Sequence, residues 1–126
     1  MSGESWRWIE RDASGHPVYC SERIWRHVLA GHPEMDFYEE EVRATIRQPE
    51  AVYDDLKGTA GTYNPDAWIV RHIAVGRTYG KHARRLLVVV IRWEPVLIGG
   101  PAGYLVTAYT TRRLSGQLEL RRGSRP

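Results

Sequence analysis

Apolar residues recur at helical spacing in two stretches of the first half of the chain. The first stretch, residues 22–30, predicts a helix that begins after an N-cap at Ser21, with Glu22 favourably placed near its positive end. Gly31 is a typical C-terminal stop. Its apolar face consists of Ile24, Trp25, Val28 and Leu29.

A second helix is expected after the corner His32-Pro33-Glu34, from an N-cap at Asp36 to about Gln48. Glu39, three residues after Asp36, would complete a capping box and could also pair with Arg43 at i,i+4. Pro49 ends the helix. The residues that share its buried face are Tyr38, Val42, Thr45 and Ile46.

The pattern then changes to that of β-strands. The predicted strands are 51–53, 68–73, 86–93 and 104–110, of which 86–93 has the β-branched run of a buried central strand. The turn Gly99-Gly100-Pro101 favours an antiparallel pairing of the last two. A short amphipathic segment, 6–10, precedes the helices. We therefore expect an α+β fold, with two N-terminal helices packed on one face of a three- to four-stranded antiparallel sheet and the other face available for a site.

With 126 residues, the chain has room for one domain, 1–126, from which the basic tail 112–126 could extend flexibly. The single cysteine, Cys20, allows no intrachain disulfide, which fits a reducing compartment, and is interpreted as a buried or incidental thiol. No apolar run approaches the ~20 residues of a membrane span, and the first residues lack a hydrophobic signal core. A soluble cytoplasmic protein is expected.

Charge is divided unevenly along the chain. Residues 21–56 carry nine acids and four bases, a net −5, whereas 67–93 carry six bases and no acid, a net +6. The tail 112–126 has five arginines and one glutamate, a net +4. A basic half of this kind attracts polyanions such as nucleic acids. A solvated surface whose charges balance between the two halves would give the same composition.

Two histidines could carry chemistry. At ~100° per residue, His27 lies more than about 90° from the centre of the first helix's apolar face, so it could face a cleft. His32 follows the glycine stop, beside Pro33. A solvent-exposed or capping histidine is the simpler interpretation of each. The sequence shows no metal-ligand spacing and no phosphate-binding glycine loop, so neither a metal nor a cofactor is expected.

Strand alternation groups further candidates. If the small and branched residues of the last strand pack under the helices, Thr107 and Tyr109 point to the open face, where Arg71 could join them. Lys81 and Arg85 are further basic residues that could bind a phosphate. Cleavage of RNA through the 2′-hydroxyl needs a base, an acid and a donor to the phosphate, which a set of this kind could supply. A polar sheet face that only meets water remains the alternative.

Four segments together resemble phage-associated members of the barnase–EndoU–colicin–RelE nuclease superfamily. They are the helix and corner 25–34, the helix and strand entry 42–52, the strand 87–90, and the strand 106–109. The resemblance spans most of the chain and implies a metal-independent endoribonuclease with two N-terminal helices and a four-stranded antiparallel sheet. It also implies RNA as substrate and a toxin–antitoxin setting, in which an acidic antitoxin or immunity protein would be a partner. The positions that match the motifs are His27, His32, Thr107 and Tyr109.

The leading hypothesis is a ribonuclease that transfers the scissile phosphate to the 2′-oxygen. His27 would be the general acid or base, and Arg71 would stabilise the phosphate charge. Tyr109 would donate to the phosphate or act as an acid, and Thr107 would position it. His32, Lys81 and Arg85 would bind the substrate. The alternatives are a non-catalytic module of the same fold that binds nucleic acid or protein, and a conflict-system component that has lost its activity.

Overall fold

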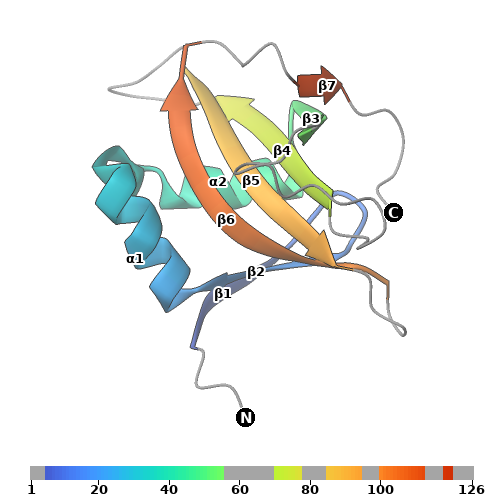
Figure 1. The fold of residues 1–126 in the computed structure, drawn as a ribbon, viewed down its shortest axis with the longest axis horizontal. Helices are drawn as coiled ribbons and strands as arrows, with labels where there is room; N and C mark the ends of the chain where they lie inside the picture. Colours follow the sequence, from blue (N-terminus) through green and yellow to red (C-terminus); the bar gives the residue numbers. More distant parts are fainter. Residues whose placement is uncertain (1–4, 56–69, 78–84, 95–99, 113–117, 121–126) are drawn as a thin grey trace.

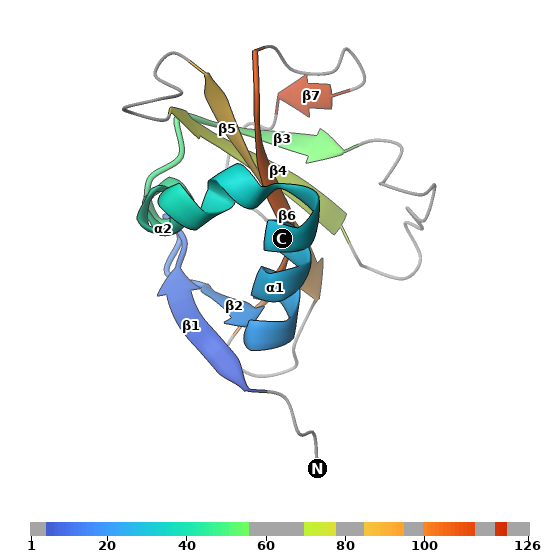
Figure 2. The ribbon, with the colours of Figure 1, turned by 90° about the vertical axis from the view of Figure 1, so that its left-hand side faces the viewer.

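The computed structural model describes residues 5–55, 70–77, 85–94, 100–112 and 118–120. These residues form an α+β fold in which two α-helices and a short 3-10 helix lie on one side of a sheet (Figures 1 and 2). The elements in chain order are β1 (Trp6–Arg11), β2 (Pro17–Ser21), α1 (Glu22–Gly31), η1 (Pro33–Phe37), α2 (Glu39–Arg47), β3 (Ala51–Asp55), β4 (Val70–Arg77), β5 (Leu86–Glu94), β6 (Ala102–Thr111) and β7 (Leu118–Leu120).

The sheet is larger than expected and is not purely antiparallel. Within the described residues it has seven strands in the order β1-β2-β6-β5-β4-β3-β7. β2 and β6 pair in parallel, whereas the other neighbours are antiparallel, including β5 with β6 as predicted. The prediction also missed that β1 and β2 precede the helices. Both strands are short, and their apolar residues are too few to mark sheet positions without the partner strand.

The first helix is confirmed almost to the residue. Ser21 caps α1 by accepting a hydrogen bond from the backbone N–H of Ile24 at 3.0 Å. The second helix begins differently, because 33–37 form the 3-10 helix η1 and α2 starts after Tyr38 without a side-chain cap. The predicted capping box at Asp36 and the pair of Glu39 with Arg43 are therefore wrong. Both charged residues bind partners on β1 instead.

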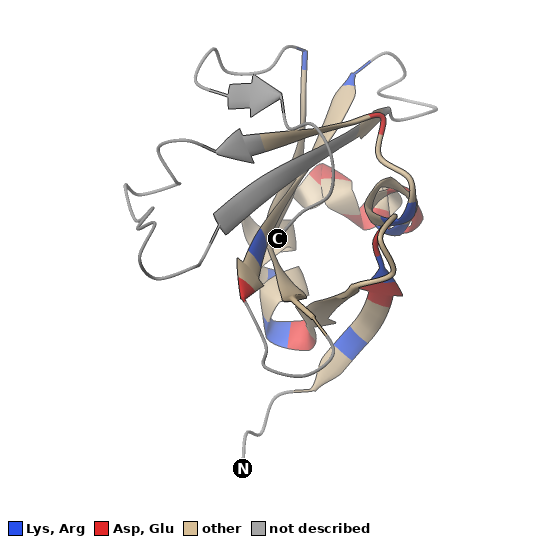
Figure 3. Ribbon diagram, turned by 90° about the vertical axis from the view of Figure 1, so that its right-hand side faces the viewer, with Lys and Arg blue, Asp and Glu red and all other residues tan. Residues whose placement is uncertain are grey.

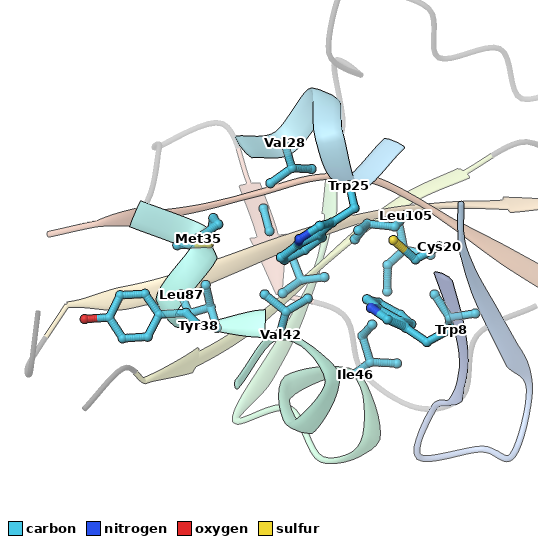
Figure 4. Packing of buried hydrophobic residues seen from close by; sticks show 14 of the residues in the cluster. Trp8, Cys20, Trp25, Val28, Met35, Tyr38, Val42, Ile46, Leu87 and Leu105 are labelled. Atoms are coloured by element: carbon cyan, nitrogen blue, oxygen red, sulfur yellow. The ribbon is translucent and has the colours of Figure 1, made fainter. Parts of the chain in front are cut away.

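The main core lies between the helices and one face of the sheet (Figure 4). Trp25 and Val28 of α1 and Val42 and Ile46 of α2 are all at most 2 % exposed. Alternate residues of β5 form the sheet side of this core: Leu87, Val89, Ile91 and Trp93. The amphipathic patterns of the two helices are thus confirmed by burial.

The opposite face of the sheet carries a second, smaller apolar cluster. Val88 and Val90 of β5 are fully buried and 3 % exposed, respectively. The partly buried residues that pack against them are Tyr53, Leu86, Val106 and Tyr109. The face expected to be available for a site therefore carries apolar side chains at its centre.

Candidate functional site

Two of the sequence candidates, His32 and Tyr109, meet at the edge of β6. β2 pairs with β6 only at Val18–Gly103 and Tyr19–Tyr104, so the later part of β6 has β5 as its only paired neighbour among the described strands. α1 lies beside this part of the strand (Figures 1 and 2). Side chains of β6 can therefore reach the end of α1 around the strand edge.

His32 and Tyr109 stack on one another at this edge. Their ring centroids are 5.4 Å apart, with planes inclined by 29°. The backbone holds His32 in place, because its N–H donates to the carbonyl of Val28 at 2.7 Å and its carbonyl accepts from Met35 at 3.0 Å. On the other side, Tyr109 packs against the apolar cluster of Val88 and Val90. The stack is thus fixed from both the helix and the sheet.

A carboxylate lies close to the same stack. Thr110 Oγ1 donates a hydrogen bond to Glu34 Oε2 at 3.5 Å. Successive strand residues point to opposite faces of a sheet. Tyr109 therefore contacts His32 on one side of the β6 edge, and Thr110 contacts Glu34 on the other. We call His32, Glu34, Tyr109 and Thr110 the His32 cluster. It brings together an imidazole, a carboxylate, a phenol and a hydroxyl.

Two arginines flank this end of the sheet. Leu86 pairs with Thr111, so Arg85 and Arg112 both lie where β5 begins and β6 ends, about three residues from Tyr109. Arg85 is partly buried and Arg112 is exposed. Positive charge is therefore available near the His32 cluster, as binding of an anion requires.

The remaining predicted site residues are dispersed. Thr107 pairs with Val90 and so shares the face of Tyr109, as expected. His27 is exposed on α1, five positions before His32, the residue that stacks on Tyr109. Arg71 is in register with Arg92, at the end of β4 and β5 away from Arg85. Lys81 lies outside the described residues.

A second feature, which we call the aromatic pocket, lies along the first half of β6. Its volume is about 350 Å³. The ring centroids of Tyr19 and Tyr104 are 5.5 Å apart and stacked, and Trp6 lies 5.0 Å from Tyr19 and 6.4 Å from Tyr104. Arg23 and Ile24 of α1 line the same pocket. Aromatic rings and cations thus share one concavity.

Arg92 supplies a cation at this pocket. Its Cζ lies 5.1 Å from the centroid of the Tyr104 ring, and its Nη1 is 3.0 Å from Glu94 Oε2. Burial, together with the nearby Glu94 carboxylate, raises the pKa of Tyr104 above its ordinary value. Loss of the Tyr104 phenol proton is therefore less favourable than in a free tyrosine.

Local irregularities of the backbone build the aromatic pocket. The β1–β2 register shifts between Trp6 and Trp8, so Trp8 enters the core while Trp6 contacts Tyr19. Gly103 allows β6 to lie close to the side chains of β5, because a Cβ there would be 2.8 Å from Ile91 Cγ2. Neither the register shift nor the role of Gly103 can be predicted from a strict alternation of side chains along a strand.

Figure 3 marks the acidic and basic positions of the described residues on the ribbon, and several of those on β1, α1 and α2 form side-chain ion pairs. Arg7 binds Glu39 and, at 3.2 Å, Glu22. Glu10, only 9 % exposed, accepts from both Arg43 and Arg47 at 2.9 Å. These pairs tie β1 to the helices, so the acidic segment of the sequence is in part a structural network.

No family model, curated protein or solved structure matches this chain. In the part of the chain that the structure describes, no cluster of three His, Cys, Asp or Glu side chains could hold a metal ion, and no helix is long and apolar enough to cross a membrane.

Several residues of these two features were not singled out from the sequence. Glu34 stood inside the motif that carries the resemblance and could have been chosen with His32. The aromatic pocket gave no local signal, because its members come from four strands and α1, and those of β1 and β2 are far in the chain from those of β5 and β6. The residues missed are Trp6, Tyr19, Arg23, Glu34, Arg92, Tyr104 and Thr110.

Proposed function

We propose that this domain is a metal-independent endoribonuclease whose reaction centre is the His32 cluster. The observation that carries the proposal is the stack of His32 on Tyr109, two residues that also match the motifs of the nuclease resemblance. Histidine exchanges protons near neutral pH, and tyrosine can donate to a phosphate oxygen. The contact supports a shared role for two side chains that lie 77 positions apart in the chain.

The reaction is a transfer of the scissile phosphate to the adjacent 2′-oxygen. A base removes the 2′-hydroxyl proton, the 2′-oxygen bonds to phosphorus, and the bond from phosphorus to the 5′-oxygen breaks. An acid gives a proton to the leaving 5′-oxygen, so the products are a 2′,3′-cyclic phosphate and a 5′-hydroxyl. His32 and Glu34 are the proposed proton-transfer pair, and Tyr109 is the proposed donor to the phosphate.

Charge near the cluster fits this substrate. Arg85 and Arg112 lie at the same end of the sheet, where guanidinium groups could bind the phosphates that flank the scissile one. Thr107 shares the face of Tyr109 and could position it, as the sequence suggests. In this arrangement His27, exposed on α1, has a peripheral role in RNA binding rather than the acid–base role first assigned to it.

A non-catalytic module that binds RNA is the second candidate. The aromatic pocket favours it, because a stacking surface with arginines binds single strands without cleaving them. The His32 stack would then serve only to hold the end of α1 against β6. An acidic protein that covers the basic surface, as an antitoxin would, is compatible with both candidates.

A panel of variants tests the proposal. Purified protein is incubated with labelled RNA in EDTA, and single-turnover rates are compared after circular dichroism has shown that each variant folds. His32→Ala and Tyr109→Phe are expected to lose at least about a hundredfold in rate, the low end for a positioned acid–base group. His27→Ala should lose much less, and Phe37→Ala, a change at an exposed ring outside the cluster, should lose nothing.

Two outcomes would reject the assignment. If folded His32→Ala cleaves at the wild-type rate, His32 is only a helix-end contact. If His27→Ala loses more than His32→Ala, the reaction centre lies on the exposed flank of α1 and not at the edge of β6.

A further inference from the structure

We infer that the aromatic pocket is a binding subsite for one unpaired nucleobase of the RNA strand, with Trp6 as the stacking ring and Arg92 as a contact to the adjoining phosphate. The inference rests on the proposed function, because it names how the same edge of β6 would hold its substrate. It adds a site that lies apart from the His32 cluster.

The exposure of Trp6 indicates that this pocket is incomplete without a ligand. Trp6 is 45 % exposed although its ring contacts both Tyr19 and Tyr104. Large aromatic side chains dominate the energetics of cores and interfaces, so a tryptophan left half open beside a concavity of about 350 Å³ indicates a docking surface for a flat apolar group. A nucleobase is such a group, and because every base has a π-face, stacking on an aromatic ring does not depend on which base is bound.

The spacing of the rings argues against an aromatic cage for a methylated ammonium group. The three centroids are only 5.0 to 6.4 Å apart, so the rings contact one another and leave no space for a cation between them. The cation already present is Arg92, which lies over Tyr104, and Arg23 lines the same concavity. Two guanidinium groups, one of them paired with Glu94, therefore already lie beside the rings, and a base that carries a phosphate meets both a ring and a guanidinium group.

The position of the pocket fits a strand that also reaches the His32 cluster. Tyr104 and Tyr109 are five residues apart on β6, roughly 16 Å at the rise of a strand. α1 runs beside this length of β6 (Figure 2), with Arg23 and Ile24 at the pocket end and His32 directly after the other end. A short single strand along this edge could therefore place one base in the pocket and a phosphodiester at the cluster.

Binding without cleavage tests the inference. The probes are a fluorescent 2′-O-methyl hexanucleotide, which has no free 2′-hydroxyl, and a matched sugar–phosphate hexamer without bases. Anisotropy at low salt gives the affinity of wild type, Trp6→Leu and the control Phe37→Ala for each probe. Trp6→Leu should weaken binding of the hexanucleotide by on the order of tenfold and leave binding of the base-free strand unchanged. Phe37→Ala should bind both as wild type does.

Other outcomes overturn the subsite. They are wild-type affinity of Trp6→Leu for the hexanucleotide, an equal loss for both probes, and no binding of the hexanucleotide by wild-type protein. If Trp6→Leu does not fold, Tyr104→Leu carries the same expectation. Cleavage of RNA is measured separately. If binding depends on Trp6 but no RNA is cleaved, only the proposed nuclease activity is rejected. If RNA is cleaved and the KM of Trp6→Leu equals that of wild type, only the subsite is rejected.

Discussion

The indole Nε1 of Trp8 donates a hydrogen bond to the carboxylate of Glu39 at 2.9 Å, which joins the first strand to the start of α2. Glu39 also binds Arg7. The hydrogen bond from Arg7 chiefly, and that from Trp8, hold the pKa of Glu39 below its ordinary value, although partial burial acts in the opposite direction. This carboxylate therefore couples folding to pH.

We predict that acid weakens the fold partly through Glu39. Because the pKa of Glu39 is lower in the folded protein, its contribution is present above the pKa of the unfolded chain, about 4.3, and is lost as the pH falls through the folded value. The free energy of unfolding, measured in urea between pH 7 and pH 3, should fall less steeply in Glu39→Gln than in wild type. Equal pH profiles for the two proteins would contradict this.

Close packing between α2 and β4 gives a second prediction. A Cβ at Gly76 would clash directly with Thr45 Oγ1 and lie 3.3 Å from Thr45 Cβ and Cγ2. Gly76→Ala should therefore destabilise the protein by about 1–3 kcal/mol, as overpacking does. Thermal or urea unfolding measures the change.

A double variant and a matched glycine serve as controls for this clash. Thr45→Ala removes the hydroxyl and methyl groups, so Gly76→Ala should cost less in that background than in wild type. Gly31→Ala adds a methyl group where no atom lies within 4 Å, and should be neutral or slightly stabilising. If the losses in the free energy of unfolding from Gly76→Ala and Thr45→Ala simply add in the double variant, the contact between these two residues does not limit the packing.

Cys20 is expected to be unreactive in the folded protein. It is fully buried, and burial raises the pKa of its thiol to about 12. The thiolate is the reactive form, so a thiol reagent at pH 8 should modify Cys20 far more slowly in native protein than in urea. Equal modification rates in native protein and in urea would mean that β2 separates readily from its neighbours and exposes Cys20. The matched control is Cys20→Ser, which should show no modification in either state.

Local patterns were enough to predict α1, the buried faces of both helices and the central strand β5. Each of these depends on residues a few positions apart, such as Ser21 and Ile24 at the cap. The start of α2 was not predictable in this way. Glu39 has the spacing of a capping box with Asp36, but Arg7 and Trp8 offer it charged and buried partners that are 32 and 31 residues away.

The candidate site was predicted less well, for two physical reasons. The register of β6 against β5 shifts beside Val106, so Leu105 and Ala108 both face the helices although strict alternation puts them on opposite sides. Strict alternation along β6 would place Tyr104 and Val106 on the same face as Ala108, whereas Val106 packs on the far face and Tyr104 contacts Arg92. The second reason is that Tyr109 meets His32 around a strand edge, a relationship that no sequence spacing encodes.

The most direct test of the proposed reaction is the dependence of cleavage on a single 2′-hydroxyl. A labelled RNA is prepared with and without a 2′-deoxy sugar at the main cleavage position, and both are incubated with the wild-type protein in EDTA. We expect the all-ribose strand to be cut to a 2′,3′-cyclic phosphate and a 5′-hydroxyl, and the 2′-deoxy sugar to abolish cleavage there. Equal cleavage of both strands, or no cleavage of either by folded protein, would contradict the proposed reaction.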